Sequence, residues 1–485
     1  MLKTGLHCLP LLFLLLFHRV HAHTPPPCLK ESKYLVGRPV LSLHEKSTED
    51  SPFVTQTVYG HQVYLVENVG HGWALMETED GYRGYAKIEG ILPDNPRWRG
   101  GRHLCRTKSV AGQVYSVPDT EKPALLRLPF DSRILLVRDL AGSDDRWLEV
   151  ILIGGEAGWI QRGDVEKVTT KSVEEVVALS RQFCQLPYIW GGTSSEGFDC
   201  SGYVQTLLKQ TGAVLPRNSG EQATSDKVDT VNHPEFPGDL LFFGHDRITH
   251  VGLYLGNDRF IHSSVWNHKP KVAITGMDVI AKPLLATRRL KEGAYAYRAS
   301  IHPIDEHMRA RPTRFRKGEH IAESLRYVRL SHRGFDGYVH TGESFVHKEV
   351  AREITEIFEE LFASEYPIEK MLPVNDYGTN DILSYEDNNS SVSYPQRTDH
   401  GLDLAVDVNP LFNPHRRGHV TIPENGREFI DRTLPCRGII TRDDPCYRAF
   451  VSRGWRWGGD LPDERGNVAW QRFYKTVRTE NGKEG

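Results

Sequence analysis

The sequence predicts a multidomain protein with two small β-barrels, an α+β domain and a second α+β domain at the C-terminal end. The chain has 485 residues, more than a single core serves when domains average about 150 residues. Short segments of alternating apolar residues occur twice before residue 168, which is typical of barrels. At Ser172 the apolar spacing changes from that of strands to that of helices, which indicates a new domain.

The charged residues are balanced, with 60 Lys and Arg against 63 Asp and Glu. A chain of this composition has no one-sided electrostatic field that would attract nucleic acid or an anionic membrane. We therefore expect neither as a partner, and the charge pattern indicates no oligomeric state.

Residues 1–22 have the features of a cleaved export signal. Lys3 precedes the apolar run Leu9 to Phe17, and small side chains stand around Ala22, where a signal peptidase would cut. The run is too short for a stable membrane anchor, and no later window offers about 20 uncharged apolar residues. We expect a mature protein outside the cytoplasm, periplasmic or secreted, with no stable anchor. The alternative is an uncleaved leader that anchors the chain.

Seven cysteines are present, and Cys8 lies within the leader. An oxidising compartment would permit disulfides among the others. Cys436 could pair with Cys446 across a short loop, and Cys28 could pair with Cys105 around the first barrel. Connectivity does not follow from sequence, so both pairings stay open.

Residues 32–100 and 108–168 are expected to form two copies of one small barrel, because residues 132–137 parallel residues 62–66. The alternating segments of the first copy are 54–58, 62–66, 73–76 and 84–86. The pattern and its closing aromatic residue resemble those of bacterial SH3 domains. This resemblance implies modules that hold the cell wall or shape the cleft of a neighbouring hydrolase.

Residues 169–298 are expected to form the first α+β domain, which a helix opens. Ser172 followed by Glu175 is a capping box, in which each side chain accepts a hydrogen bond from the other residue's backbone. The apolar residues that then recur at helical spacing are Val173, Val176, Val177 and Phe183.

Cys200 is expected at or near the N-terminus of the next helix. It follows the loop 191–195 and precedes Val204, Leu207 and Leu208, which have the spacing of a buried helical stripe. Free N–H groups and the helix dipole favour a thiolate at such a position, and the thiolate is the form that attacks carbonyl groups. The alternative is a small core residue, because free cysteines are mostly buried and inert.

Residues 249–262 read as a β-hairpin with a Gly-Asn-Asp turn. If the turn is centred on Gly256, His250 faces His262 on one side of the sheet, with Cβ atoms about 5 Å apart. His250 would then take the proton of the thiol, and His262 would fix the tautomer and orientation of that ring. The alternative is a pair of surface histidines.

The segment 169–298 resembles the NlpC-type peptidases, a papain-like α+β family that cuts peptidoglycan stem peptides. The motifs that carry the resemblance are the order Cys, His, His and the segments 188–192, 215–217 and 237–240. The site residues that it implies are the nucleophile Cys200, the base His250, the third polar residue His262 and, around the amino end of the substrate, Tyr188, Asp199 and Ser201. No cofactor is implied. Asp199 could pair with a free α-ammonium group, although a helix N-cap is an equal interpretation.

The resemblance implies a thiol peptidase of the cell wall whose substrates are peptidoglycan stem peptides. In relatives with two preceding SH3 modules, cleavage falls between γ-D-glutamate and the diamino acid, because the barrels wall off the cleft. The backbone N–H of Cys200 would help to stabilise the oxyanion. Two alternatives stay open: an inactive wall-binding protein, and an acyltransferase that uses the same thiolate.

Residues 303–485 are expected to form the second α+β domain, with a long amphipathic helix. The stripe of this helix is Val350, Ile354, Phe358 and Leu361. Further segments resemble the VanY-like zinc D-Ala-D-Ala carboxypeptidase family: 366–371, 388–391, His400 with 405–410, and 454–459. The resemblance implies that His400 and Asp407 occupy zinc-ligand positions.

The third zinc ligand of that family is missing. Its closing Asp-x-x-His motif matches Ala469 to Arg472, and a guanidinium offers no lone pair to a metal. Two ligands are too few for catalytic zinc. We therefore predict a retained fold without hydrolytic zinc, in which Arg472 pairs with Asp407 and the old groove can still bind stem peptides. The alternative is that His415 or His419 completes the site.

Overall fold

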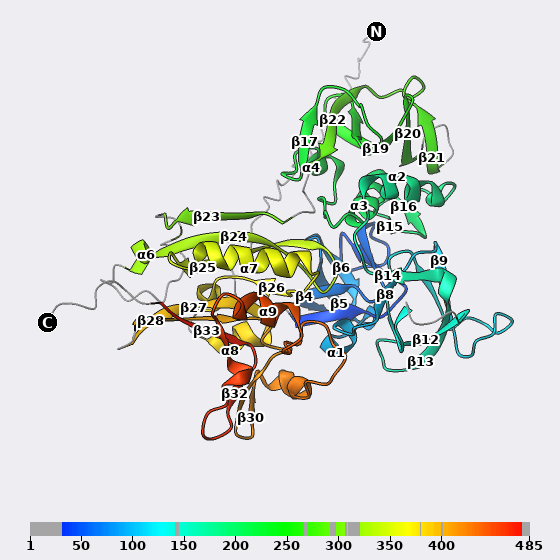
Figure 1. Cartoon of the computed structure of the whole chain (residues 1–485). Helices are drawn as coiled ribbons and strands as arrows, with labels where there is room; N and C mark the ends of the chain where they lie inside the picture. Colours follow the sequence, from blue (N-terminus) through cyan, green and yellow to red (C-terminus); the bar gives the residue numbers. More distant parts are fainter. Residues whose placement is uncertain are drawn as a thin grey trace, which may run out of the picture.

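The computed structural model describes most of the chain between residues 32 and 477 (Figure 1). The described residues are 32–140, 145–265, 270–291, 297–305, 308, 321–378, 380–398 and 401–477. The expected leader, Cys28 and His400 lie outside them. None of the helices within these residues combines the length and the apolar character needed to cross a membrane.

The first N-terminal unit is a seven-stranded sheet with the order β3-β2-β6-β5-β4-β1-β7. Its strands are β1 (Ser32–Val36), β2 (Val40–His44), β3 (Phe53–Val58), β4 (Gln62–Gly70), β5 (Trp73–Thr78), β6 (Arg83–Lys87) and β7 (Ile91–Pro93), with the 3-10 helix η1 (Ile88–Gly90) before β7 and α1 (Pro96–Arg99) after it. Burial alternates along these strands, as at Leu41 and Leu43, because one face of the sheet forms the core.

The second N-terminal unit repeats the first. Its sheet has the order β10-β9-β13-β12-β11-β8-β14, which is the first order with every strand number raised by seven. Its elements are β8 (Leu104–Thr107), β9 (Ala111–Tyr115), β10 (Leu126–Pro129), β11 (Arg133–Leu136), β12 (Trp147–Ile151), β13 (Ala157–Gln161), η3 (Arg162–Asp164) and β14 (Val165–Lys167). The predicted repeat is confirmed. The sheet begins at Leu104, before the boundary that we expected at residue 108, because β8 pairs with β11 and β14.

The third unit packs helices against a six-stranded sheet of order β17-β22-β18-β19-β20-β21. Its elements are α2 (Val173–Ser180), η4 (Arg181–Phe183), β15 (Thr193–Ser194), β16 (Gly197–Phe198), α3 (Cys200–Lys209), α4 (Ser219–Ala223), β17 (Val228–Val231), β18 (Leu240–Gly244), β19 (Ile248–Gly256), β20 (Arg259–Ser264), β21 (Lys271–Gly276) and β22 (Leu284–Leu290). The capping box of Ser172 and Glu175 is present, so α2 begins where the sequence predicted. Val204 and Leu207 of α3 are buried in the core of this unit with Leu253 of β19.

The C-terminal unit contains three sheets, with orders β23-β24-β25, β26-β27-β28-β33-β31 and β30-β29-β32. Its strands are β23 (Ala299–Pro303), β24 (Leu325–Arg333), β25 (Val339–His347), β26 (Lys370–Met371), β27 (Asn389–Thr398), β28 (Gly401–Asp407), β29 (His415–Arg417), β30 (Val420–Ile422), β31 (Arg456–Trp457), β32 (Val468–Ala469) and β33 (Arg472–Val477). It begins at Ala299 rather than residue 303, because β23 pairs with β24.

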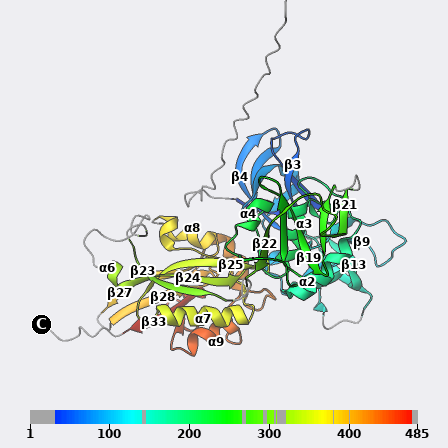
Figure 2. The same cartoon turned by 90° about the horizontal axis from the view of Figure 1, so that it is seen from above.

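The helices of the C-terminal unit lie beside these sheets (Figure 2). They are α6 (Ile321–Ser324), α7 (Ala351–Ala363), η6 (Val374–Tyr377), α8 (Asp381–Glu386), η7 (Glu424–Ile430), α9 (Pro445–Val451) and η8 (Gly458–Asp460). The predicted stripe of the long helix is confirmed, because Ile354, Phe358 and Leu361 of α7 are buried in the main core of the unit.

Buried charges join the first N-terminal unit to the C-terminal unit. Glu369 forms ion pairs with Arg99 and, at 3.5 Å, with Lys33, and Lys33 also pairs with Asp387 at 2.9 Å. We call these residues, with Asp94 beside Arg99, the junction cluster. Burial alone would raise the pKa of Glu369, but Arg99 and Lys33 lower it to about 2. The carboxylate is therefore charged in the folded protein.

The cysteines do not form the pair suggested within the C-terminal unit. Cys436 and Cys446 are both buried free thiols, so the pairing that we left open between them is wrong. Cys446 lies inside the main core, whereas Cys436 belongs to a separate apolar cluster with Phe335 and Phe412. Two side chains that face different cores cannot meet in the narrow geometry of a disulfide. Cys105 is also a buried free thiol.

Candidate active site

Cys200 is the first residue of α3, as its sequence context predicted. Asp199 caps the helix, because its Oδ1 accepts a hydrogen bond of 2.7 Å from the backbone N–H of Gly202. The backbone N–H groups of Val251 and Ser201 lie close enough to the sulfur to lower its pKa. Val251 follows His250 on β19, so the strand that carries the histidine lies against the thiol.

The thiol itself is held neutral by its surroundings. Burial, and then the negative charge of Asp199, raise the pKa of Cys200 to about 11, although the N–H groups of Val251 and Ser201 lower it. The sequence favoured a thiolate at this helix N-terminus. The helix dipole alone does not produce one at rest, because burying a lone negative charge costs more free energy than the dipole supplies. The sulfur therefore needs a base that can take its proton.

Two histidines form a buried pair on β19 and β20, the strands that pack against the helix of Cys200. Nε2 of His250 lies 2.7 Å from Nδ1 of His262, and the ring centroids are 4.9 Å apart. On the far side, Nε2 of His262 lies 2.9 Å from the hydroxyl of Thr275 on β21. Only 7% of His250 and 1% of His262 are exposed, so water cannot replace these contacts.

The contacts allow one arrangement of protons in which His250 can act as a base. Because Nε2 of His250 is occupied by His262, only Nδ1 of His250 is left to accept a proton from a thiol. In that state Nε2 of His250 donates to Nδ1 of His262, and Nε2 of His262 donates to Thr275. The three residues thus form one directional chain of hydrogen bonds that ends at a hydroxyl.

Both imidazoles are neutral near pH 7. Burial, followed by the neighbouring His262, lowers the pKa of His250 well below its ordinary value. Burial lowers the pKa of His262 to about 4. A proton that passes from the thiol to His250 leaves an ion pair without net charge, so the transfer avoids the cost of a single buried charge.

The hairpin has a different register from the predicted one. Tyr254 pairs with Phe260, whereas a turn centred on Gly256 would pair it with Asp258. Asn257 and Asp258 both have positive φ, so they form the two-residue turn, and a bulge precedes them. His250 therefore does not face His262 directly. The shift of two residues keeps both rings on one face, which is why they still meet.

Asp199 has a buried partner that the sequence analysis did not assign. Arg217 donates to both of its carboxylate oxygens, at 3.1 Å to Oδ1 from Nη1, and Oδ2 also accepts 3.0 Å from the N–H of Gly191. The arginine lay within the 215–217 motif, but its partner is 18 residues away and nothing local identified it. Asp199 is thus both a helix cap and half of an ion pair.

Ser201 and Tyr188 lie in the same surroundings. The hydroxyl of Ser201 accepts a hydrogen bond of 3.1 Å from Arg217 and donates one of 3.3 Å to Asp199. Burial raises the pKa of Tyr188, and the neighbouring Cys200 and Asp199 raise it further. The structure therefore brings Tyr188, Asp199 and Ser201 close to Cys200, and it brings His250 and His262 together as a pair.

Both N-terminal units contact the loop that precedes Cys200. From β3 of the first copy, Gln56 exchanges hydrogen bonds with Thr193 and accepts one of 3.0 Å from Ser194. At the end of the equivalent strand β10, the N–H of Phe130 donates 2.9 Å to Ser195. Gly191 has φ +78°, and a Cβ there would lie 2.3 Å from the carbonyl oxygen of Phe53, so only glycine fits.

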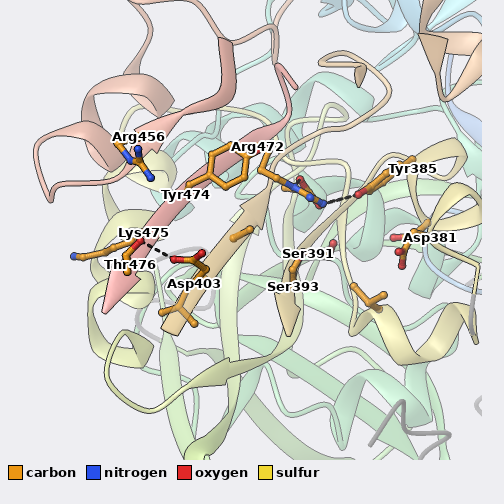
Figure 3. Close-up of a pocket in the computed structure, with 15 residues that line it drawn as sticks. Asp381, Tyr385, Ser391, Ser393, Asp403, Arg456, Arg472, Tyr474, Lys475 and Thr476 are labelled. Carbon is orange, nitrogen blue, oxygen red and sulfur yellow. Dashed lines mark hydrogen bonds and ion pairs between the residues drawn. The ribbon is translucent and has the colours of Figure 1, made fainter. Parts of the chain in front are cut away.

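A second polar cluster lies in the C-terminal unit (Figure 3). Nε and Nη2 of Arg472 each donate 2.7 Å to one oxygen of Asp407, and the hydroxyl of Tyr385 donates 3.0 Å to the same carboxylate. The predicted pair of Arg472 with Asp407 is present. Both carboxylate oxygens are therefore occupied by protein groups.

These residues do not fit a catalytic zinc ion. The described residues contain no group of three or more His, Cys, Asp or Glu side chains placed to hold a metal. Arg472 lowers the pKa of His415 after burial and Arg417, so a cation stands close to that ring. A protonated guanidinium beside the aspartate opposes a divalent cation there.

Comparisons with known proteins identify two regions of the chain. Residues 185–289 match the NlpC/P60 family, and residues 393–465 match the family described as D-alanyl-D-alanine carboxypeptidase. The chain therefore contains an NlpC/P60 domain and a carboxypeptidase-like segment within a multidomain protein that has several further β-sheets.

Curated relatives extend beyond the catalytic domain. A gamma-D-glutamyl-L-lysine dipeptidyl-peptidase of Bacillus cereus is 29% identical over 245 residues, which cover 46% of this chain and 71% of the relative. The protein of the same name from Bacillus subtilis is 27% identical, with coverages of 50% and 82%. A crystal structure of an NlpC/P60 family protein from Bacillus cereus matches with a TM-score of 0.47 at 22% identity, over 53% of this chain and 99% of that one.

Proposed function

Because residues 185–289 form an NlpC/P60 domain, we propose that this chain is a cysteine endopeptidase that hydrolyses peptidoglycan stem peptides. The observation that carries the proposal is the grouping at Cys200, with the strand of His250 against the sulfur and His262 behind that ring. Nucleophile, base and orienting group in this order are the parts that acyl transfer from an amide requires.

The reaction follows from the hydrogen-bond chain. The thiol of Cys200 gives its proton to Nδ1 of His250, and the thiolate attacks the amide carbonyl carbon. The oxyanion accepts a hydrogen bond from the backbone N–H of Cys200. His250 then protonates the leaving amine, and the C–N bond breaks. Water, deprotonated by His250, hydrolyses the thioester and restores the thiol.

We place the cut between γ-D-glutamate and the diamino acid. Two relatives, aligned over 245 and 254 residues, are named for that bond. The barrel contacts at Gln56 and Phe130 border the loop before Cys200, which supports a cleft that is closed on the amino side and admits a short free end. Tyr188, Asp199 and Ser201 would line this side, where the carboxylate of Asp199 favours an α-ammonium group.

Arg217 partly neutralises Asp199, which weakens the attraction of this carboxylate for the α-ammonium group of a substrate. Arg217 already donates to both of its oxygens, so an α-ammonium group would share the carboxylate with a guanidinium. Burial lowers the pKa of Arg217, and Asp199 and then Asp80 raise it. Asp80 would therefore help to balance the positive charge of Arg217 when an α-ammonium group shares Asp199. The proposal therefore assigns recognition of the amino end to this buried network and not to Asp199 alone.

We further propose that the barrels are bacterial SH3-like modules and that the protein acts outside the cytoplasm. The doubled strand order supports two copies of one module. The expected leader at residues 1–22 supports export, and the site of action would be the cell wall.

The test is digestion of the synthetic peptide L-Ala-γ-D-Glu-L-Lys-D-Ala, its diaminopimelate analogue and their N-acetylated forms, followed by mass spectrometry. We expect free L-Ala-γ-D-Glu from the unblocked peptides and at least tenfold slower cleavage of the acetylated ones, since a blocked amine cannot pair with a carboxylate. Products that carry an amide or ester in place of the free acid would instead identify an acyltransferase. Absence of any product with the reduced enzyme would overturn the proposal.

A further inference from the structure

A cavity of about 290 Å³ lies where the second N-terminal unit, the segment that leads to α2 and the C-terminal unit meet. The cationic side chains that line it are Arg102 before β8, Lys167 of β14, Arg333 of β24 and Arg437 after η7. Neither Cys200 nor Arg472 borders this cavity, so it is separate from both polar clusters described above.

Arg437 is held in place by neutral groups. Its Nη2 donates 2.8 Å to the carbonyl oxygen of Phe335 and 3.4 Å to that of Arg99, and its guanidinium lies 5.8 Å from the centroid of the Phe335 ring. Nε of Arg437 is buried and has no hydrogen-bond partner in the described ranges. No carboxylate of the described residues forms an ion pair with this side chain. The orientation of the cation is therefore fixed, while its charge has no counter-ion.

The surroundings of Arg437 oppose its charge. Burial, and then Arg133 and Arg99, lower its pKa to about 10, and Asp336 offsets them only in part. An anion beside the guanidinium would remove this cost, because opposite charges attract strongly where little water screens them. The cavity is the side from which such an anion can approach.

Two more arginines border the same space. Arg333 lies 4.6 Å from the centroid of the Phe362 ring, and its Nε is buried without a hydrogen-bond partner among the residues that the structure describes. Arg102 is exposed, and its side chain makes no hydrogen bond or ion pair within the described part of the chain. Both guanidinium groups can therefore donate to a ligand.

Carboxylates do not balance these cations. Asp139 lines the cavity, but it pairs with Lys167 at 3.0 Å. Glu365 also lines it, and within the described residues it forms no ion pair. Burial lowers the pKa of Arg333, and Glu365 opposes this effect only in part. Three arginines thus face one unpaired carboxylate, which leaves positive charge in excess.

Hydroxyl groups complete the walls. Thr169 and Thr170 line the cavity, and neither side chain has a hydrogen-bond partner among the described residues. The group that satisfies these walls carries about two negative charges and several oxygen acceptors, as a phosphate does and a carboxylate does not. The volume is near the lower end of the roughly 300–1,000 Å³ of small-molecule sites, so the sugar or polyol of a phosphate ester also has room.

We propose that this cavity binds a phosphate group, either as the free ion or as an ester of a sugar or polyol. Arg333 and Arg437 would donate to its oxygens, with Arg102 at the exposed side and the threonine hydroxyls opposite. Because Arg102 leads into the second N-terminal unit and the other two arginines belong to the C-terminal unit, a bound phosphate would tie these units together. Binding does not need the thiol of Cys200.

The test is isothermal calorimetry of the full-length chain at low ionic strength with inorganic phosphate, glycerol 3-phosphate and acetate. We expect the tighter of the two phosphates to bind at least about tenfold more tightly than acetate, because it forms more charge-assisted hydrogen bonds. Tighter binding of glycerol 3-phosphate would identify an ester as the ligand, and equal or tighter binding of inorganic phosphate would identify the free ion. The same phosphate should raise the midpoint of thermal unfolding, and acetate at equal ionic strength should not.

Three variants locate the site. Arg102→Gln changes an exposed side chain and should weaken phosphate binding by about fivefold, and Arg333→Gln should weaken it by about tenfold. Arg437→Lys keeps a positive charge but loses the planar set of donors, so it should also weaken binding by about tenfold. The matched control is Arg352→Gln, which removes an exposed cation from α7 outside the cavity and should change the affinity by less than about twofold.

Acetate that binds as tightly as phosphate would refute the proposal, and so would an affinity that stays the same in Arg102→Gln and Arg333→Gln. An equal loss in Arg352→Gln would mean that phosphate only screens surface charge. The proposal also fails if neither phosphate binds at 10 millimolar, about the weakest affinity that calorimetry detects. None of these outcomes bears on the endopeptidase, because Cys200 does not line this cavity.

Discussion

The catalytic sheet and the C-terminal sheet each bring polar side chains into contact on one face, at the same separation and with opposite consequences. His250 and His262 meet at 2.7 Å as neutral rings, and Arg472 and Asp407 meet at 2.7 Å as a full ion pair. Neighbouring groups exchange protons readily only when their proton affinities are close. Burial lowers the pKa of both imidazoles, whereas Asp407 raises that of Arg472. The first face is thus built to move a proton, and the second to hold a fixed charge.

The largest effect should come from removing the nucleophile. Cys200→Ala should reduce cleavage of the unblocked stem peptide by about 10⁴-fold or more, because no acyl enzyme forms. Product formation by mass spectrometry measures it. Cys184→Ala is the control, since Cys184 is a partly buried free thiol of the same domain. Retained cleavage in Cys200→Ala, or equal loss in both variants, would contradict the assignment.

Interruption of the hydrogen-bond chain should have the next largest effect. His262→Gln should lower kcat by about 10²-fold, because the amide orients His250 less well and cannot share its charge. Thr275→Val, one step further away, should cost about tenfold or less. Steady-state kinetics with unchanged KM distinguishes this loss from a loss of binding. If Thr275→Val were the more damaging change, the order of the chain would be wrong.

A fixed charge pair should matter for stability instead of rate. Glu369→Gln should destabilise the fold by about 3 kcal/mol, because Arg99 and Lys33 then lack a buried counter-charge. Urea unfolding measures the loss. The control Glu356→Gln breaks an exposed pair with Arg352 on α7 and should change stability by less than about 0.5 kcal/mol.

The same carboxylate gives that stability a pH dependence. The pKa of Glu369 is about 2 in the folded protein against 4.5 for the free side chain. Its contribution is therefore complete above about pH 4.5 and is lost as the pH falls towards 2. A stability difference between the parent and Glu369→Gln that stays constant from pH 6 to pH 3 would contradict this origin.

The pH dependence of catalysis should show a smaller effect. Catalysis needs neutral His250, and burial keeps its pKa well below 6.5. The acid limb of the kcat/KM profile should therefore lie below pH 6.5, so that activity persists into mildly acidic solution. A profile measured with the unblocked peptide tests this. An acid limb above pH 6.5 would mean that the imidazole is not buried in the working enzyme.

The smallest effect should follow from placing a histidine at position 472 of the C-terminal unit, where the carboxypeptidase family is expected to have its third zinc ligand. In the Cys200→Ala background, Arg472→His with added zinc should give no hydrolysis of acetyl-D-Ala-D-Ala, because Ala469 still lacks an acidic group to act as base. Chromatography for free D-alanine detects any product. Zinc-dependent release of D-alanine would contradict this expectation, because a single substitution would then have turned the fixed charge pair into a hydrolytic site.

The local features of the site could be predicted from sequence, and the long-range ones could not. The capping box at Ser172, the position of Cys200 and the shared face of the two histidines follow from spacing along a helix or a strand. The hairpin register was wrong because Gly256 looked like the turn residue, whereas Asn257 and Asp258 also adopt positive φ.

Other errors arose from burial, which local sequence does not encode. The raised pKa of the Cys200 thiol depends on the whole core packed around it. The pairing of Asp199 with Arg217 and that of Glu369 with Arg99 join residues 18 and 270 positions apart. By contrast, the pairing of Arg472 with Asp407 was predictable, because both stood in positions that the family brings together.

The doubled strand order has a consequence for the origin of the cleft. Equivalent places in the two copies, β3 and the end of β10, reach neighbouring residues of one loop, at Ser194 and Ser195. The two copies thus supply both sides of a single support, and loss of either copy would leave that loop half-attached. The two equivalent strands therefore act as one support, and removal of either contact should loosen the loop before Cys200.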